Sequence, residues 1–338
     1  MAATIGLAQP RLDGEDIYWQ ELRPNEGGRL VVVHRSSDGS TRDVNPAPLN
    51  ARTRVHEYGG GAVLVNAATV YFSDFADQRL YRARPGEAPV ALTHSAGMRY
   101  ADGVIDRQRN RLICVREDHT EPEREPVNTI VAIDLHSGTE TVLVAGNDFY
   151  AAARLSADSR LCWLTWHHPN MPWDGCELHV AAVRPDGSLA DSSLVAGGPA
   201  ESIVQPEWSA DGTLYFASDR TGWWNLYRWD GGKPEPIAGR EAEFAGPAWV
   251  FGATSFAVES PNRIICAYSE RGRGRLASLD TATGTLTEIA TPYTTFAGVR
   301  AHGGRAVFIG ASPTRSEELA SLDLASGRLD VLRRSTSI

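Results

Sequence analysis

The chain has 338 residues, 42% of them hydrophobic, and a formal net charge of −9 from 33 Lys and Arg against 42 Asp and Glu. An acidic chain without a cationic cluster argues against nucleic-acid binding, because neutralising phosphates requires grouped Lys and Arg. No stretch approaches the ~18 apolar residues that span a membrane, and the first residues lack the basic and apolar segments of a signal peptide. We therefore expect a cytoplasmic protein that contacts neither nucleic acid nor membrane.

One β pattern recurs seven times along the chain. Each copy contains an apolar β run, a polar hairpin, a second β run and a turn rich in Asp, Gly or Ser. The first runs begin near Ile17, Val70, Leu112, Leu161, Leu214, Ile264 and Ala306. A period of roughly 40–50 residues with strands and no helical pattern is typical of a β-propeller. We predict an all-β, seven-bladed β-propeller that occupies residues 1–338 as a single domain.

The second β runs lie at matching places in the repeats, at residues 28–35, 128–138, 176–183, 225–232, 274–284 and 318–327. Most end in turns whose Asp, Ser and Gly supply side-chain hydrogen bonds or positive φ angles. We interpret these runs as the outer strands of the blades. The N-terminal strands are expected to pair within the first blade, since no strand-exchange pattern is visible.

The four cysteines, Cys114, Cys162, Cys176 and Cys266, show no C-x-x-C spacing. Three of them lie in apolar β runs, which favours buried, reduced thiols in a cytoplasmic protein. A disulfide between strands is the alternative. The segment WSADGTLYFASDRTGWWNLYR (residues 208–228) reads as strand, Asp-Gly turn, strand, polar hairpin and strand. We expect its Trp208 to pack between blades.

This segment resembles the propeller repeat of TolB and of the prolyl oligopeptidase family. Four further stretches are similar to the N-terminal propeller of the acylaminoacyl-peptidase and dipeptidyl-aminopeptidase branch of that family. They are RTRVHEYGGGAVLV (residues 52–65), VYFSDFADQRLYR (70–82), LTWHHPNMPWDGCELHV (164–180) and EFAGPAWVFG (243–252). The resemblance covers nearly all of residues 10–335 and implies a TolB-like, prolyl-oligopeptidase-like propeller.

The family joins such a propeller to a C-terminal α/β-hydrolase domain with a G-x-S-x-G nucleophile elbow and a Ser-His-Asp triad. The present sequence has no G-x-S-x-G, and its nearest string, GATSF at residues 252–256, lacks the second Gly. We therefore predict that the chain holds no catalytic residues and that the hydrolase domain is separate or missing. The resemblance implies a gating role: the propeller restricts access to a serine peptidase site to short peptides.

Three hairpins carry more polar and aromatic side chains than a turn requires, and we expect them on one rim. Their candidate residues for the peptide path or the domain interface are Arg116, Glu117, Asp118 and His119, then His167, Asn170, Trp173 and Asp174, then Arg220, Trp223 and Trp224. The acidic members could hold an α-amino group, the arginines a carbonyl or carboxylate, and the tryptophans apolar side chains. The alternative is that all of them stabilise their own hairpins and blade contacts, with one of the adjacent tryptophans in the core.

His56 and Glu57 precede three glycines and form a second candidate for an interface or for the channel wall. The glycines indicate positive φ or close backbone approach. Residues 243–249 have the same two interpretations. His119, His167 and His168 lie on neighbouring hairpins, but no ligand spacing such as H-E-x-x-H occurs, so we predict neither a metal nor another cofactor.

A stand-alone TolB-like propeller that binds a peptide or protein partner is the alternative function. A broad apolar patch on the face of the three hairpins would favour a hydrolase partner, whereas a polar rim with a focused pocket would favour independent binding. The weakest hypothesis is an enzyme acting in its own channel, since this needs paired carboxylates or a metal there.

Overall fold

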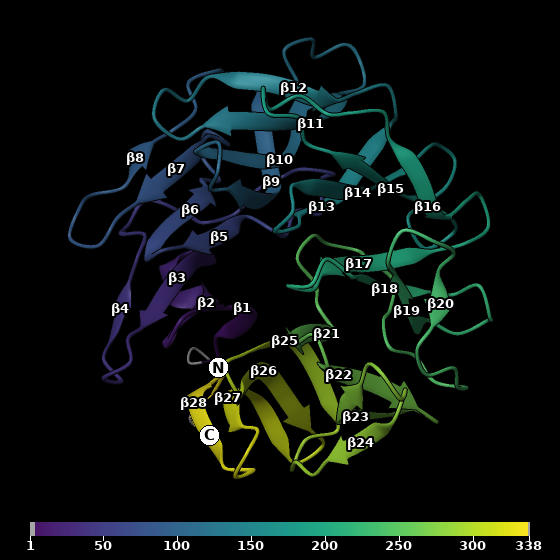
Figure 1. Cartoon of the computed structure of the whole chain (residues 1–338). Helices are drawn as coiled ribbons and strands as arrows, with labels where there is room; N and C mark the ends of the chain where they lie inside the picture. Colours follow the sequence, from purple (N-terminus) through teal and green to yellow (C-terminus); the bar gives the residue numbers. More distant parts are fainter. Residues whose placement is uncertain (1–3, 337–338) are drawn as a thin grey trace.

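The computed structural model describes residues 4–336, in which 28 strands and one short 3₁₀ helix, η1 (Pro24–Glu26), are formed. The strands make seven antiparallel sheets of four strands each, arranged around a central axis (Figure 1). The predicted seven-bladed β-propeller is confirmed. No helix in the described part of the chain is long and apolar enough to cross a membrane.

The blades follow one another in chain order. Blade 1 contains β1 (Gly6–Asp13), β2 (Asp16–Arg23), β3 (Arg29–Arg35) and β4 (Thr41–Asp43). Blade 2 contains β5 (Val63–Asn66), β6 (Thr69–Ser73), β7 (Leu80–Ala83) and β8 (Val90–Ala91). Blade 3 contains β9 (Met98–Asp106), β10 (Arg111–Asp118), β11 (Val127–Asp134) and β12 (Glu140–Val144).

Blade 4 contains β13 (Phe149–Leu155), β14 (Arg160–Trp166), β15 (Glu177–Ala182) and β16 (Ser193–Gly197). Blade 5 contains β17 (Ile203–Trp208), β18 (Leu214–Ser218), β19 (Asn225–Trp229) and β20 (Glu235–Pro236). Blade 6 contains β21 (Phe256–Ser260), β22 (Arg263–Glu270), β23 (Arg273–Asp280) and β24 (Leu286–Ile289). Blade 7 contains β25 (Thr295–His302), β26 (Arg305–Ser312), β27 (Arg315–Asp323) and β28 (Leu329–Arg334).

The position of the predicted strands within each blade needs correction. The seven apolar runs are the second strands, and the runs taken for outer strands are the third ones. A fourth strand forms the outer edge and is largely exposed: all three residues of β4 are exposed, β8 has only two residues, and the apolar residues of β12 are at most half-buried. Because such strands bury little apolar surface, hydrophobic periodicity cannot reveal them.

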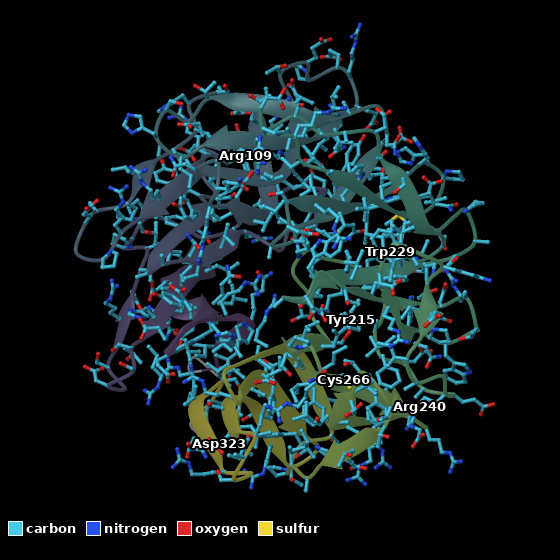
Figure 2. All side chains as sticks on the ribbon, viewed as in Figure 1. Arg109, Tyr215, Trp229, Arg240, Cys266 and Asp323 are labelled. Atoms are coloured by element: carbon cyan, nitrogen blue, oxygen red, sulfur yellow. The ribbon has the colours of Figure 1, made fainter. Side chains whose placement is uncertain are left out.

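The core consists of apolar clusters between neighbouring blades. In the cluster between blades 5 and 6, buried Tyr215 from β18 and Cys266 from β22 belong to the same group (Figure 2). All four cysteines are buried and free, as predicted. The indole Nε1 of Trp208 donates to the carbonyl oxygen of Arg154 at 3.0 Å, which places Trp208 between blades 5 and 4 as expected.

The ring closes between blades 1 and 7 without strand exchange, and the two chain ends lie close together (Figure 1). The backbone N–H of Ile5 donates to the carbonyl of Ser335 at 2.8 Å. Buried Glu21 on β2 pairs with Arg333 of β28 at 2.7 Å. An apolar cluster from both blades fills the rest of this seam. Closure therefore depends on packing and a few polar contacts.

Two links between blades cross on one face of the ring. Residues 44–62 connect blades 1 and 2, and residues 237–255 connect blades 5 and 6. They meet where Phe251 forms a parallel bridge with Gly60. A Cβ at Gly60 would lie 2.4 Å from the Phe251 carbonyl oxygen, and its φ is +84°. The sequence suggested that the three glycines allow close backbone approach or a positive φ, and the structure shows both.

Candidate functional site

A cavity of about 340 Å³ opens where these two links meet the inner strands, and we call it the aromatic pocket. Its walls come from residues 56–59 and 248–253, from the inner strands β13 and β17, and from two hairpins. The hairpins are the β10–β11 and β14–β15 connections, which lie on the same face because each joins a second strand to a third. Two links between blades and two hairpins within blades 3 and 4 therefore contribute to a single site.

Several aromatic rings line the pocket. The imidazole of His56 packs against Phe149, Trp166 and Phe251, with ring centroids 5.2, 5.5 and 4.7 Å away. Burial lowers the pKa of His56 to about 4, so the ring is neutral at physiological pH. Its Nε2 is buried with no hydrogen-bond partner among the described residues. His56 therefore acts as part of an apolar wall that retains one unsatisfied polar atom.

The outer part of the aromatic pocket is apolar and open to solvent. Trp249 packs against Trp173 at 4.3 Å between ring centroids and against Tyr58 at 5.8 Å. Tyr58 is 59% exposed and Trp249 54% exposed. Val250 and Met171 line the same cavity and are also exposed. Together these side chains form a continuous apolar surface around the pocket mouth.

Besides Asp102, three carboxylates line the pocket. Glu117 is buried, accepts the backbone N–H of His56 at 2.8 Å and lies 3.0 Å from Nε2 of His119. Glu57 accepts from Arg99 at 2.6 Å, and the same guanidinium lies 3.8 Å from Glu117. Glu125 is exposed and forms no ion pair with any residue in the range 4–336. Among the described residues, Glu125 is therefore the carboxylate of the pocket that is left without a cationic partner.

Comparison with known proteins finds neither a matching family model nor a matching curated protein. Solved structures do match. A puromycin-hydrolysing peptidase of Mycobacterium tuberculosis has a TM-score of 0.93 and 38% identity over 99% of this chain and 54% of its own. A puromycin hydrolase has a TM-score of 0.92 and 36% identity over 100% of this chain and 55% of its own. The matched part of these relatives is their N-terminal half. The chain is a prolyl oligopeptidase-family propeller.

This prolyl oligopeptidase-family propeller spans about half the length of those relatives. Two more distant structures share its fold. A prolyl endopeptidase matches with a TM-score of 0.73 at 14% identity, and the acylaminoacyl peptidase of Pyrococcus horikoshii with a TM-score of 0.71 at 14% identity. The family resemblance predicted from the sequence is confirmed.

The structure brings five of the predicted site residues of the propeller into the aromatic pocket: His56, Glu57, Glu117, His119 and Trp173. Their neighbours on the same hairpins have local partners instead. Arg116 pairs with Glu140 at 2.9 Å, and Asp118 accepts the hydroxyl of Thr120 at 2.6 Å. Alternation along β10 explains this division, since consecutive side chains point to opposite faces of the sheet.

The remaining candidates lie outside the pocket lining. On the second hairpin, His167 lies 3.2 Å from Asp148, Asn170 donates to the carbonyl of Pro199, and Asp174 accepts the Met171 N–H at 2.9 Å. On the third hairpin, Arg220 pairs with Glu201, Trp223 is exposed, and Trp224 packs in the cluster between blades 5 and 6. One of the adjacent tryptophans is thus packed and the other exposed, as expected. Within residues 4–336, no group of three His, Cys, Asp or Glu is placed to hold a metal ion.

Sequence reasoning did not identify three aromatic residues that shape the propeller's pocket, Phe149, Trp166 and Phe251, whereas Tyr58 lay within the marked stretch 56–61. The three come from an inner strand, the end of a second strand and the link between blades 5 and 6. No spacing relates such positions, because only closure of the ring brings them together. The stretch 243–249 was marked, and its Trp249 does line the pocket.

Proposed function

We propose that this propeller is the substrate-selecting half of a cytoplasmic serine peptidase of the prolyl oligopeptidase family. Its aromatic face packs against an α/β-hydrolase domain, separate from these residues, that supplies the Ser-His-Asp triad. The propeller itself performs no bond cleavage. It limits entry to short peptides and orients them by their α-amino group.

The exposed apolar surface around the aromatic pocket is the observation that carries the proposal. Tyr58, Trp249, Val250 and Met171 are all more than a third exposed and border one cavity. A contiguous apolar patch of this kind on a soluble domain marks an interaction surface. A hydrolase domain placed over this face would cover the patch and enclose the pocket between the two domains.

The pocket chemistry supports a peptide with a free amino terminus as the substrate. Glu57, Glu117 and Glu125 can accept hydrogen bonds from an ammonium group, while the aromatic wall receives an apolar side chain. The relatives at 36–38% identity are named for the hydrolysis of puromycin, and a related mutant at 35% identity was solved in complex with PGG. These names agree with a small substrate for the complete peptidase.

The test begins with the source DNA, where we expect an open frame adjacent to or continuing from this one that encodes G-x-S-x-G followed by Asp and His. Co-expressed with the propeller, its product should form a stable complex on gel filtration. A fluorophosphonate probe should label the hydrolase and leave the propeller unlabelled. Stoichiometric labelling of the propeller alone would overturn the proposal.

The interface is tested with a matched pair of tryptophans. Trp249→Glu should weaken the complex and allow cleavage of longer peptides, because Trp249 lies at the pocket mouth. Trp223→Glu introduces the same change at a tryptophan that is 39% exposed but outside the pocket, and it should leave the complex intact. Equal effects of the two substitutions would contradict the proposed docking face.

A stand-alone peptide-binding propeller is the second candidate function. It is favoured by the focused pocket of about 340 Å³ that residues 4–336 form by themselves. Calorimetry of the 338-residue chain with a tripeptide and its N-acetylated form separates the two functions. Tight binding without any hydrolase would support independent recognition, whereas absence of binding would favour a site completed by the second domain.

A further inference from the structure

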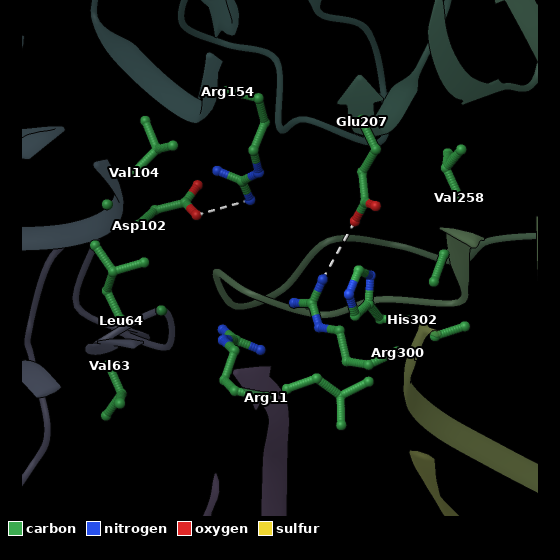
Figure 3. A pocket seen from close by; sticks show the side chains of 15 residues that line it. Arg11, Val63, Leu64, Asp102, Val104, Arg154, Glu207, Val258, Arg300 and His302 are labelled. Atoms are coloured by element: carbon green, nitrogen blue, oxygen red, sulfur yellow. Dashed lines mark hydrogen bonds and ion pairs between the residues drawn. The ribbon is translucent and has the colours of Figure 1, made fainter. Parts of the chain in front are cut away.

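A second cavity, of about 370 Å³, lies inside the central channel next to the aromatic pocket. Asp102 and Arg154 line both cavities, so the two spaces adjoin. The channel cavity is lined mainly by the inner strands of the blades. It contains five charged side chains, each from a different blade: Arg11, Asp102, Arg154, Glu207 and Arg300. Figure 3 shows the three guanidinium groups converging on the same space.

The two carboxylates of this channel cavity are already engaged. Asp102 pairs with Arg154 at 3.0 Å through one oxygen, and its other oxygen accepts the Ala152 N–H at 2.6 Å. Glu207 lies 3.3 Å from Arg300 and also accepts from the Gln205 amide at 2.9 Å. Each acid is therefore held by one arginine and one further N–H donor.

Arg11 has no carboxylate partner in the described part of the chain. Its guanidinium donates only to the carbonyl of Pro10 at 3.1 Å and to the side-chain oxygen of Gln9 at 3.4 Å. Arg300 also has an unsatisfied donor, since its Nε is buried without a partner. Three guanidinium groups facing two carboxylates leave one uncompensated positive charge in the cavity.

This excess charge is unfavourable in the empty channel. Burial, followed by the neighbouring charges of Arg300 and Arg154, holds the pKa of Arg11 well below its usual range. Asp102 and Glu207 act in the opposite direction but do not cancel the effect. An anion bound among the three arginines would neutralise the excess charge and use the free N–H donors of Arg11 and Arg300.

We propose that the channel cavity binds one small oxyanion, held by Arg11, Arg300 and Arg154. The planar forks of arginine match the two oxygens of a carboxylate or the oxygens of a phosphate. Both ligand chemistries fit this donor set, so the oxyanion is either a free inorganic anion or the C-terminal carboxylate of a short peptide. The site does not depend on the proposed peptidase role, because it is formed entirely within the propeller.

The test measures thermal stability and calorimetric binding of the 338-residue chain with inorganic phosphate at fixed ionic strength, with chloride as the reference. Phosphate should raise the melting temperature of the unsubstituted protein. Arg11→Gln should weaken phosphate binding by about tenfold or more, the effect of losing a charge-assisted hydrogen bond. It should also stabilise the ligand-free protein, because the unpaired charge is removed. A generally disrupted fold would not produce this second effect.

Arg328→Gln is the matched control, since Arg328 is exposed and, among residues 4–336, forms an ion pair only with Asp330. This substitution removes the same charge and should leave phosphate binding unchanged. Arg11→Lys keeps the charge but loses the planar guanidinium with its paired N–H donors, so it should retain part of the phosphate affinity.

A tripeptide and its C-terminal amide distinguish the two sources of the oxyanion. Preference for the free acid identifies a peptide carboxylate, and phosphate binding alone identifies a free anion. Failure of the unsubstituted protein to bind either ligand, or equal binding by Arg11→Gln, would overturn the proposal.

Discussion

The backbone N–H of Phe251 donates to the carbonyl oxygen of Gly59 at 3.0 Å, although the two residues belong to links on opposite sides of the ring. The side-chain amide of Gln9 on β1 donates to the carbonyl of the same Phe251 at 3.1 Å. Both backbone polar groups of Phe251 are thus satisfied across the channel end. This contact places the Phe251 ring against His56 and thereby fixes one wall of the aromatic pocket.

Gly60→Ala tests how strongly this crossing depends on close backbone approach. A Cβ would clash with Phe251 at 2.4 Å and would occupy a φ of +84°, so we expect a loss of about 2–4 kcal/mol in the free energy of unfolding. Gly86→Ala is the control, with a φ of +77° and no atom within 4 Å of its Cβ. It should cost about 1 kcal/mol. If Gly60→Ala and Gly86→Ala lost the same free energy of unfolding in urea, the positive φ alone would explain the need for glycine at position 60.

The second and third strands could be predicted from sequence because they are buried on both faces and rich in β-branched residues, as in β10 and β11. The fourth strands could not, since β8 and β20 bury almost nothing. The site shows the same division. Glu117 and Trp173 could be predicted because their hairpins carry more polar and aromatic side chains than a turn requires. Phe149 has no such signal, since only closure of the ring brings it to His56. The pocket residues that the sequence did not reveal are distant from one another in the chain, and no local sequence pattern relates them.

His56 predicts a pH dependence of stability. Its folded-state pKa of about 4 lies below the ordinary value of 6.5, so between these values the unfolded chain binds the proton more readily. Stability from this group is therefore complete above about pH 6.5 and falls as the pH drops toward 4, by up to about 3 kcal/mol. His56→Phe should reduce the slope of the unfolding free energy against pH in this window, by the amount that corresponds to one bound proton. An unchanged slope in urea melts from pH 4 to 7 would contradict the buried, neutral imidazole.

Glu125 and Glu117 should differ in how they affect peptide binding. Glu125→Gln removes an exposed, unpaired carboxylate, so it should weaken binding of an amino-terminated tripeptide severalfold and leave stability within about 0.5 kcal/mol. Glu117→Gln should weaken binding and also destabilise the fold by about 2 kcal/mol, since buried Glu117 supports His56, His119 and Arg99. Calorimetry is performed on the complete peptidase if the hydrolase domain is found. The N-acetylated peptide is the control, and a loss of its affinity equal to that of the free amine would argue against recognition of the amino group.

Glu21 tests the closure of the ring between blades 1 and 7. Its buried carboxylate accepts from the Trp19 indole at 3.2 Å and from Arg23 at 2.9 Å, and it pairs with Arg333 of the last strand at 2.7 Å. Glu21→Gln keeps the side-chain shape but loses the charge, which leaves Arg333 without its carboxylate partner, whereas Arg23 keeps Glu26 and Asp43. We expect a loss of about 2–3 kcal/mol in urea denaturation, because a buried hydrogen-bonded charge is removed from the seam.

Glu15→Gln provides the matched control for this prediction at the same seam. Glu15 is exposed and lies 3.7 Å from Arg305 of blade 7, so its ion pair is surrounded by water. Such pairs contribute little, and the change should stay within about 0.5 kcal/mol. If the two substitutions had the same small effect, apolar packing alone would hold the ring closed. If Glu21→Gln instead lowered the cooperativity of unfolding along with its midpoint, blade 1 would be separating from blade 7 before the rest of the propeller unfolds.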